Sequence, residues 1–494
     1  MTSQYRSILK ATSIFGGTQF VQILVGLVRS KFVALLIGTT GMGLSSIYTS
    51  SLSVFITVFG MGINMSVVKS LSKAYDAQDW QGYTKISMAF NRILLILGII
   101  GTLFVIAISS LLSDWSFNDR EHIGDYCFLS LIVLFTLLSQ GNTALLISSR
   151  KIKSTAACSL VSSIASLLIA IPFFYFWRLD GIVPGIVFST VANYVVTFLY
   201  VRNVKLEPCE LSLNETWKFA RSFIALGMAM VIASLLGNVT NYFVNLFINR
   251  LGGLSDLGLY GAGYTITFQT LSMVFAAMGS DYFPRLSAAI ANKDRMSQII
   301  NEQSEILLLL STPILAVFMI VAPIVIRVLL SEEFLPVTGF IRTLCLGMLL
   351  RAASYALGYV SFAKGDKKIY LFVEGGYSNI CYLSFAVLFY YLWGINGMAW
   401  SFVLSYSLYY SVIKYVDVLR YGYQMSNDVL KLSIYSIASL LFLLCISYVL
   451  PKVWYYLAGS VFVIFICCSY LRILFKKTDI LNNSICLFKS KVNL

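Results

Sequence analysis

Charged residues are scarce in this 494-residue chain: Asp, Glu, Lys and Arg make up 12% of it, against 58% hydrophobic residues. A soluble protein of this size needs a larger charged surface, so the composition excludes that class. The chain also has a single His, and its nine Cys show no C-x-x-C spacing. We therefore expect no metal site, no structural disulfide and no cofactor.

In place of charge, the chain has a succession of apolar stretches. Residues 93–112 and 433–450 carry no charge at all. A spanning helix needs about 20 apolar residues, because lipid offers no partner to backbone N–H and C=O groups. We predict an all-α polytopic membrane protein with about 14 transmembrane helices. The predicted spans are residues 12–36, 42–68, 86–112, 122–148, 155–177, 181–201, 222–248, 255–281, 303–330, 336–362, 369–393, 395–416, 430–450 and 453–474.

The basic residues predict the orientation of these spans. If both termini are cytoplasmic, 26 of the 36 Lys and Arg residues fall in cytoplasmic segments. This follows the positive-inside rule, so we expect a multi-pass protein of the bacterial inner membrane with both termini in the cytoplasm. The same bias accounts for the net charge of +14. A nucleic acid is therefore not expected as a partner.

A weak internal repeat has an offset of 215 residues. The matching positions are Gly43-Leu44 and Gly258-Leu259, Leu71-Ser72 and Leu286-Ser287, and Asp79 and Asp294. Because six spans are an even number, the second half enters the membrane in the same direction as the first, so the repeats are parallel. We predict two six-helix bundles around a central cavity, an N-lobe over 1–206 and a C-lobe over 207–425. An extra transmembrane pair with a basic tail follows over 426–494.

Ionisable residues within the predicted spans are candidates for a transport site, since burying charge in lipid is costly. Arg351 lies about 15 residues into its span, too deep to reach the surface, and Arg342 lies on the opposite face of that helix. Arg29 and Lys31 lie in the first span, where each could instead snorkel outward. Buried cations outnumber carboxylates, which suits a phosphate or diphosphate bound by paired charge-assisted hydrogen bonds. Glu374 could be a cavity carboxylate or the partner of a nearby cation.

Amide side chains give a second set of candidates. Asn238, Asn241 and Asn245 recur at three and four residues along one helix face, and Gln22 and Asn64 lie in other spans. A polar stripe on a spanning helix favours contact with water or with sugar hydroxyls. Hydrogen bonding between helices is the alternative.

Five segments resemble a known family: 351–364 (RAASYALGYVSFAK), 368–374 (KIYLFVE), 31–38 (KFVALLIG), 41–44 (GMGL) and 282–287 (YFPRLS). They are similar to the bacterial O-antigen and lipid-linked oligosaccharide flippases (Wzx-type O-antigen translocases), in particular to the enterobacterial common antigen branch. The similarity covers about residues 1–420. It implies the fold of the multidrug/oligosaccharidyl-lipid/polysaccharide exporter superfamily.

The resemblance also implies a function. Such a flippase moves an undecaprenyl-diphosphate-linked oligosaccharide, the repeat unit of O-antigen lipopolysaccharide or a related polysaccharide, from the cytoplasmic to the periplasmic leaflet. Lys31, Arg351 and Glu374 fall where that branch carries Lys or Arg, Lys or Arg, and Glu, whereas Arg342 has no match. We expect Arg351, Lys31 and Arg29 to face the diphosphate, and Glu374 to couple transport to H⁺ or Na⁺. Membrane lipids, a polysaccharide polymerase and chain-length proteins are candidate partners.

Two other functions stay open. A cation-coupled multidrug antiporter of the same fold would need carboxylates in its cavity. A membrane-embedded glycan polymerase or ligase would need acid–base residues in sizeable outer loops. The longest predicted outer loop is 113–121, with His122 at its rim. We therefore expect a transporter without catalytic residues.

Overall fold

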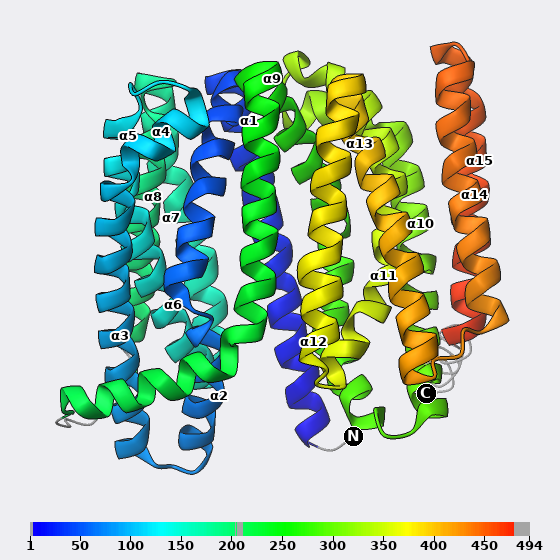
Figure 1. Ribbon diagram of the computed structural model, residues 1–494. Helices are drawn as coiled ribbons and strands as arrows, with labels where there is room; N and C mark the ends of the chain where they lie inside the picture. Colours follow the sequence, from blue (N-terminus) through cyan, green and yellow to red (C-terminus); the bar gives the residue numbers. More distant parts are fainter. Residues whose placement is uncertain (1–2, 203, 205–210, 479–494) are drawn as a thin grey trace, which may run out of the picture. The chain divides into compact units, whose positions relative to one another are not determined.

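The computed structural model describes residues 3–202, 204 and 211–478. Every element in this part of the chain is a helix, which confirms the predicted all-α class (Figure 1). The elements are α1 (Ser3–Gly60), α2 (Ile63–Asp76), α3 (Trp80–Ala107), α4 (Ser109–Phe117), α5 (Ile123–Leu129), α6 (Leu131–Ser148), α7 (Ile152–Trp177), α8 (Ile182–Val201), α9 (Leu213–Ala289), α10 (Lys293–Leu329), the 3₁₀ helix η1 (Glu332–Val337), α11 (Thr338–Ala363), α12 (Lys367–Tyr370), the π-helix η2 (Leu371–Tyr377), α13 (Ser378–Tyr421), α14 (Asn427–Val449) and α15 (Lys452–Thr478).

Within the described residues, 11 helices are long and apolar enough to cross a membrane. Three of the elements contain a glycine with non-helical backbone angles: Gly38 in α1 (φ 64°), Gly253 in α9 (φ 79°) and Gly394 in α13 (φ 58°). Positive φ favours glycine, which has no Cβ to clash. Each break falls between two of the predicted spans. The count of 14 spans stays a prediction, because 11 apolar helices, three of them broken, are what the fold establishes.

Local sequence explains where several helices begin. Asp79 caps α3 by accepting a hydrogen bond of 2.8 Å from the backbone N–H of Gly82. Ser212 and Glu215 form a capping box at the start of α9, in which each side chain accepts from the other residue's N–H. Ser426 caps α14 through the N–H of Val429. These polar residues satisfy N–H groups that the first helical turn leaves without partners.

The chain forms two compact units. Unit 1 comprises Met1–Ala262 with Val328–Phe334, and unit 2 comprises Gly263–Arg327 with Leu335–Leu494. Unit 1 thus holds α1 to α8 and the first part of α9, together with the short segment around the end of α10. The predicted lobes over 1–206 and 207–425, and the cavity between them, stay predictions.

In unit 1, α7 packs along α8 and α1, and α3 packs along α6. Its core includes the buried side chains of Tyr48, Phe90 and Leu137. In unit 2, α11 packs along α13 and α14, and most side chains of α11 are buried. The last pair, α14 and α15, lies at the edge of unit 2 (Figure 1), and exposes Val449 and Val453.

Two glycines allow a close helix crossing inside unit 1. A Cβ on Gly43 would lie 1.9 Å from the carbonyl oxygen of Leu254, and a Cβ on Gly258 would lie 1.9 Å from that of Thr39. Each glycine therefore lets its helix rest directly on the backbone of the other. The pairs Gly43 and Gly258, and Thr39 and Leu254, are both 215 residues apart, as are the breaks at Gly38 and Gly253. The crossing thus relates equivalent positions of the repeat that the sequence indicates.

Candidate functional site

Arg351 lies on α11 in unit 2, surrounded by aromatic side chains. Its guanidinium carbon lies 4.9 Å from the ring centroid of Phe268 and 5.7 Å from that of Tyr406. One terminal nitrogen donates to the hydroxyl of Tyr264 over 3.5 Å. Ring faces attract a cation without neutralising its charge. Because a guanidinium carries five N–H donors, this arrangement orients Arg351 and leaves donors for an anion.

Glu374 lies near the same face of α11. Its carboxylate accepts a short hydrogen bond from the hydroxyl of Tyr409 on α13. A Cβ on Gly358 would lie 2.8 Å from one of its carboxylate oxygens, so the carboxylate rests against α11 at this glycine. Gly358 follows Arg351 by seven residues, about two helical turns, and therefore shares its face. A cation and a carboxylate thus line one boundary between α11 and α13, with the π-helical segment η2 holding the carboxylate.

Arg342 contacts different elements of unit 2, as its predicted position on the opposite helix face requires. Its guanidinium lies 4.3 Å from the ring centroid of Tyr455 on α15. Its Nε donates to the backbone carbonyl of Met319 on α10 over 3.3 Å. Arg342 is therefore a packing residue between α11, α10 and α15.

The two predicted cations of α1 lie in unit 1 and have different surroundings. Arg29 is exposed and lines a polar cavity. The ammonium of Lys31 donates a short hydrogen bond to the backbone carbonyl of Leu330, just after the end of α10. Three residues further on, Glu333 accepts a hydrogen bond of 2.6 Å from the hydroxyl of Thr39. The segment around Leu330 is thus bonded to α1, a connection that the sequence analysis did not anticipate.

Two of the predicted sugar-binding amides bond to α1. The side-chain amide of Asn238 donates to the hydroxyl of Thr57 over 2.7 Å, and that of Asn245 donates to the carbonyl of Ser46 over 3.5 Å. Both are contacts between helices, the alternative that the sequence left open. Among the other amides, Asn241 is exposed, Gln22 lines the cavity that holds Arg29, and the side chain of Asn64 lies outside the described residues. Sugar binding by the set stays a prediction.

Asp417 is not among the site residues predicted from the sequence. This residue lies in α13 and is fully buried, and neither carboxylate oxygen has a hydrogen-bond partner in the described part of the chain. An isolated buried carboxylate is costly to ionise, and the described residues give Asp417 no hydrogen bond that would offset this cost. In the sequence, Asp417 is the acidic residue that directly follows the predicted span 395–416. The predicted span ends at residue 416, whereas α13 continues to Tyr421.

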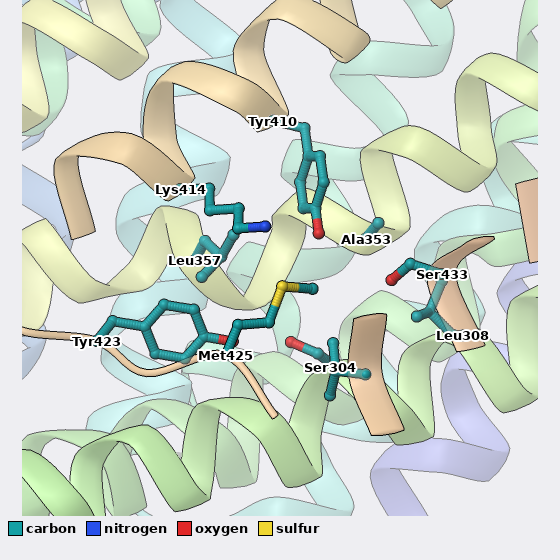
Figure 2. Close-up of a pocket in the computed structure, with 10 residues that line it drawn as sticks. Ser304, Leu308, Ala353, Leu357, Tyr410, Lys414, Tyr423, Met425 and Ser433 are labelled. Carbon is teal, nitrogen blue, oxygen red and sulfur yellow. The ribbon is translucent and has the colours of Figure 1, made fainter. Parts of the chain in front are cut away.

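Two further findings limit the choice of sites. In the described residues, no group of three or more His, Cys, Asp or Glu side chains could hold a metal ion. Figure 2 shows a pocket of unit 2 toward which Lys414 and Tyr410 point from α13, with the hydroxyls of Ser304 and Ser433 nearby. This pocket leaves no room for a water molecule, so it is a gap in packing and not a ligand site.

Comparison with known sequences assigns the family. Residues 8–338 match the model of a family described as polysaccharide biosynthesis protein. The lipid III flippase of Escherichia coli (strain K12) is 20% identical over 410 residues, which make up 82% of this chain and 97% of that protein. The lipid III flippase of Shigella flexneri matches to the same extent.

Solved structures share the fold. An inward-facing multidrug resistance MATE family transporter of the MOP superfamily aligns with a TM-score of 0.70 and 15% identity, over 81% of this chain and 94% of that one. The lipid II flippase MurJ, in an inward closed conformation, aligns with a TM-score of 0.70 and 12% identity, over 95% of this chain and 99% of that one. The relatives named here are transporters and flippases. The chain belongs to the polysaccharide biosynthesis protein family and has the fold of the MOP superfamily transporters.

Proposed function

We propose that this protein is a flippase in the bacterial inner membrane. Its substrate is an undecaprenyl-diphosphate-linked oligosaccharide, the repeat unit of an O-antigen or a related surface polysaccharide. The sugar–diphosphate head enters a central cavity from the cytoplasm while the prenyl chain remains in lipid. Alternating access then presents the head to the periplasm.

The observation that carries this proposal is Arg351, a permanent cation on a predicted spanning helix. Aromatic rings at 4.9 Å and 5.7 Å orient it without cancelling its charge. A diphosphate can accept two parallel N–H donors from a guanidinium, which a point charge cannot supply as well. A membrane potential that is negative inside then favours outward movement of the anion by about 2.3 kcal/mol per charge per 100 mV.

A multidrug antiporter is the second candidate, because a MATE family transporter shares the fold. The decisive experiment reconstitutes the purified protein in vesicles and offers both substrates. We expect a fluorescent undecaprenyl-diphosphate-linked glycan to cross the bilayer, measured by its accessibility to an external glycosidase, and ethidium not to be transported. Transport of ethidium without movement of the glycan would assign the antiporter function instead.

Coupling to an ion is proposed for Glu374. Glu374→Gln preserves the shape and can still accept from Tyr409, but it cannot take up or release a proton or neutralise Na⁺. We expect the variant to flip glycan at equal rates with and without an imposed H⁺ or Na⁺ gradient, whereas a gradient accelerates the wild type. The measurement is the initial flipping rate in vesicles with and without each gradient.

Glu302→Gln provides the matched control. Glu302 lies on α10 in the same unit, is exposed, and forms an ion pair of 3.4 Å with Arg285. This control should respond to gradients as the wild type does. An undiminished gradient response in Glu374→Gln would exclude the coupling role and leave the flippase proposal intact.

A further inference from the structure

A polar cavity lies inside unit 1 between α1, α6, α7 and α8. Its volume is about 350 Å³, within the range of small-ligand sites. Ten of the 14 described residues that line it are Ser, Thr, Asn, Gln or Arg. All four helices belong to one unit, so the cavity is a feature of that unit alone.

The hydroxyl groups of this cavity face a ligand mainly as acceptors. Five of them already donate their proton to a backbone carbonyl, at distances between 2.9 and 3.2 Å, so that only their oxygen lone pairs can bind a ligand. These bonds run from Thr143 to Ser139, from Thr155 to Lys151, from Ser163 to Ser159, from Ser166 to Ser189 and from Thr197 to Tyr194. Thr197 also accepts from the side-chain amide of Asn142 over 3.3 Å, which leaves it one lone pair. A lining of this kind suits a ligand rich in hydroxyl donors.

The charge of the cavity lining further limits the class of ligand that can bind. Arg29 is the charged member of the described lining, which contains no carboxylate and no aromatic ring. A cationic drug would find neither an opposite charge nor a ring face. Arg29 supplies donors for a ring oxygen, an N-acetyl carbonyl or a carboxylate of the ligand.

Ser162 borders the cavity but does not offer its hydroxyl to it. This residue is 7% exposed and lines the cavity, and its hydroxyl has no hydrogen-bond partner among the described residues. Because this oxygen is covered by protein, a ligand in the cavity does not reach it, and the proposed site does not include it.

We propose that this cavity of unit 1 binds a sugar residue of the transported glycan. Sugar hydroxyls donate to the Ser and Thr oxygens, and Arg29 donates to an acceptor on the sugar. This inference rests on the flippase function proposed above and places sugar recognition on α1, α6, α7 and α8. Asn238 and Asn245 then serve helix packing instead.

The test measures equilibrium binding of two probes to the full chain in lipid nanodiscs. One probe is undecaprenyl diphosphate, and the other is the same lipid carrying a disaccharide of N-acetylglucosamine. Ser163→Phe fills the cavity, so we expect about tenfold weaker binding of the sugar probe and less than twofold change for the sugar-free probe. Ser163→Ala removes a single oxygen of the lining and should weaken binding of the sugar probe about threefold, with folding preserved.

Val161→Phe is the matched control, because Val161 lies on the same helix and is 42% exposed, outside the cavity lining. It should bind both probes as the wild type does. Equal losses for the two probes in Ser163→Phe, or no loss in either cavity variant, would overturn the sugar site. A wild type that binds neither probe would instead refute the flippase proposal, so the two failures are distinguishable.

Discussion

Gly43→Ala and Gly258→Ala are each expected to lower the thermal stability of the purified protein strongly. A Cβ at either position would lie 1.9 Å from a backbone carbonyl oxygen, of Leu254 or Thr39 respectively. A backbone atom cannot rotate away as a side chain can, so the two helices must separate. Overpacking of this kind costs about 1–3 kcal/mol, and more where backbone must shift. The measurement is the apparent melting temperature in detergent.

Gly124→Ala is the control for this pair of substitutions. Gly124 lies in α5 of the same unit, and a Cβ there would have no atom within 4 Å. It should melt at or slightly above the wild-type temperature, because alanine favours the helix. The double variant Gly43→Ala/Gly258→Ala should lose less than the sum of the two single losses, since one separation relieves both clashes. If Gly43→Ala has the same melting temperature as Gly124→Ala, the close crossing does not exist.

The broad fold could be predicted from the sequence because its determinants are local. Uninterrupted apolar runs determine the spanning helices, and the breaks at Gly38, Gly253 and Gly394 fall between predicted spans. Helical periodicity also predicted that Arg342 and Arg351 lie on opposite faces of one helix. The contacts agree with this: Arg342 contacts α10 and α15, whereas Arg351 contacts α9 and α13.

The partners of polar side chains could not be predicted in the same way. A stripe of Asn residues indicates which helix face is polar, but water, sugar and a neighbouring helix satisfy an amide equally well. Asn238 bonds to Thr57, which is 181 residues away, and Lys31 bonds to Leu330, 299 residues away. The burial of Asp417 likewise depends on neighbours that only the tertiary structure brings together. These contacts are determined by the packing of helices that are distant in the sequence, and the periodicity of a sequence does not reveal that packing.

Arg351→Ala is expected to reduce glycan flipping about 100-fold at unchanged abundance in the membrane. Hydrogen bonds to charged groups contribute about 1.5–3 kcal/mol each, and a guanidinium can offer two to one diphosphate. Arg351→Lys keeps the charge but loses the planar fork, so it should retain an intermediate rate. The rate is measured in vesicles with a fluorescent undecaprenyl-diphosphate-linked glycan, with surface polysaccharide in cells as a second readout.

Arg342→Ala separates a specific role of Arg351 from a general effect of losing a cation from α11. Both arginines lie on this helix, but Arg342 packs against Tyr455 and the carbonyl of Met319. Its loss should lower the melting temperature and leave the flipping rate per folded molecule unchanged. We expect Arg351→Ala to show the reverse pattern, because in the proposed function its N–H donors bind the diphosphate, while Phe268 and Tyr406 contact it through their ring faces. Equal losses of flipping in the two variants would mean that removing either positive charge from α11 impairs transport. The proposal that Arg351 binds the diphosphate would then be wrong.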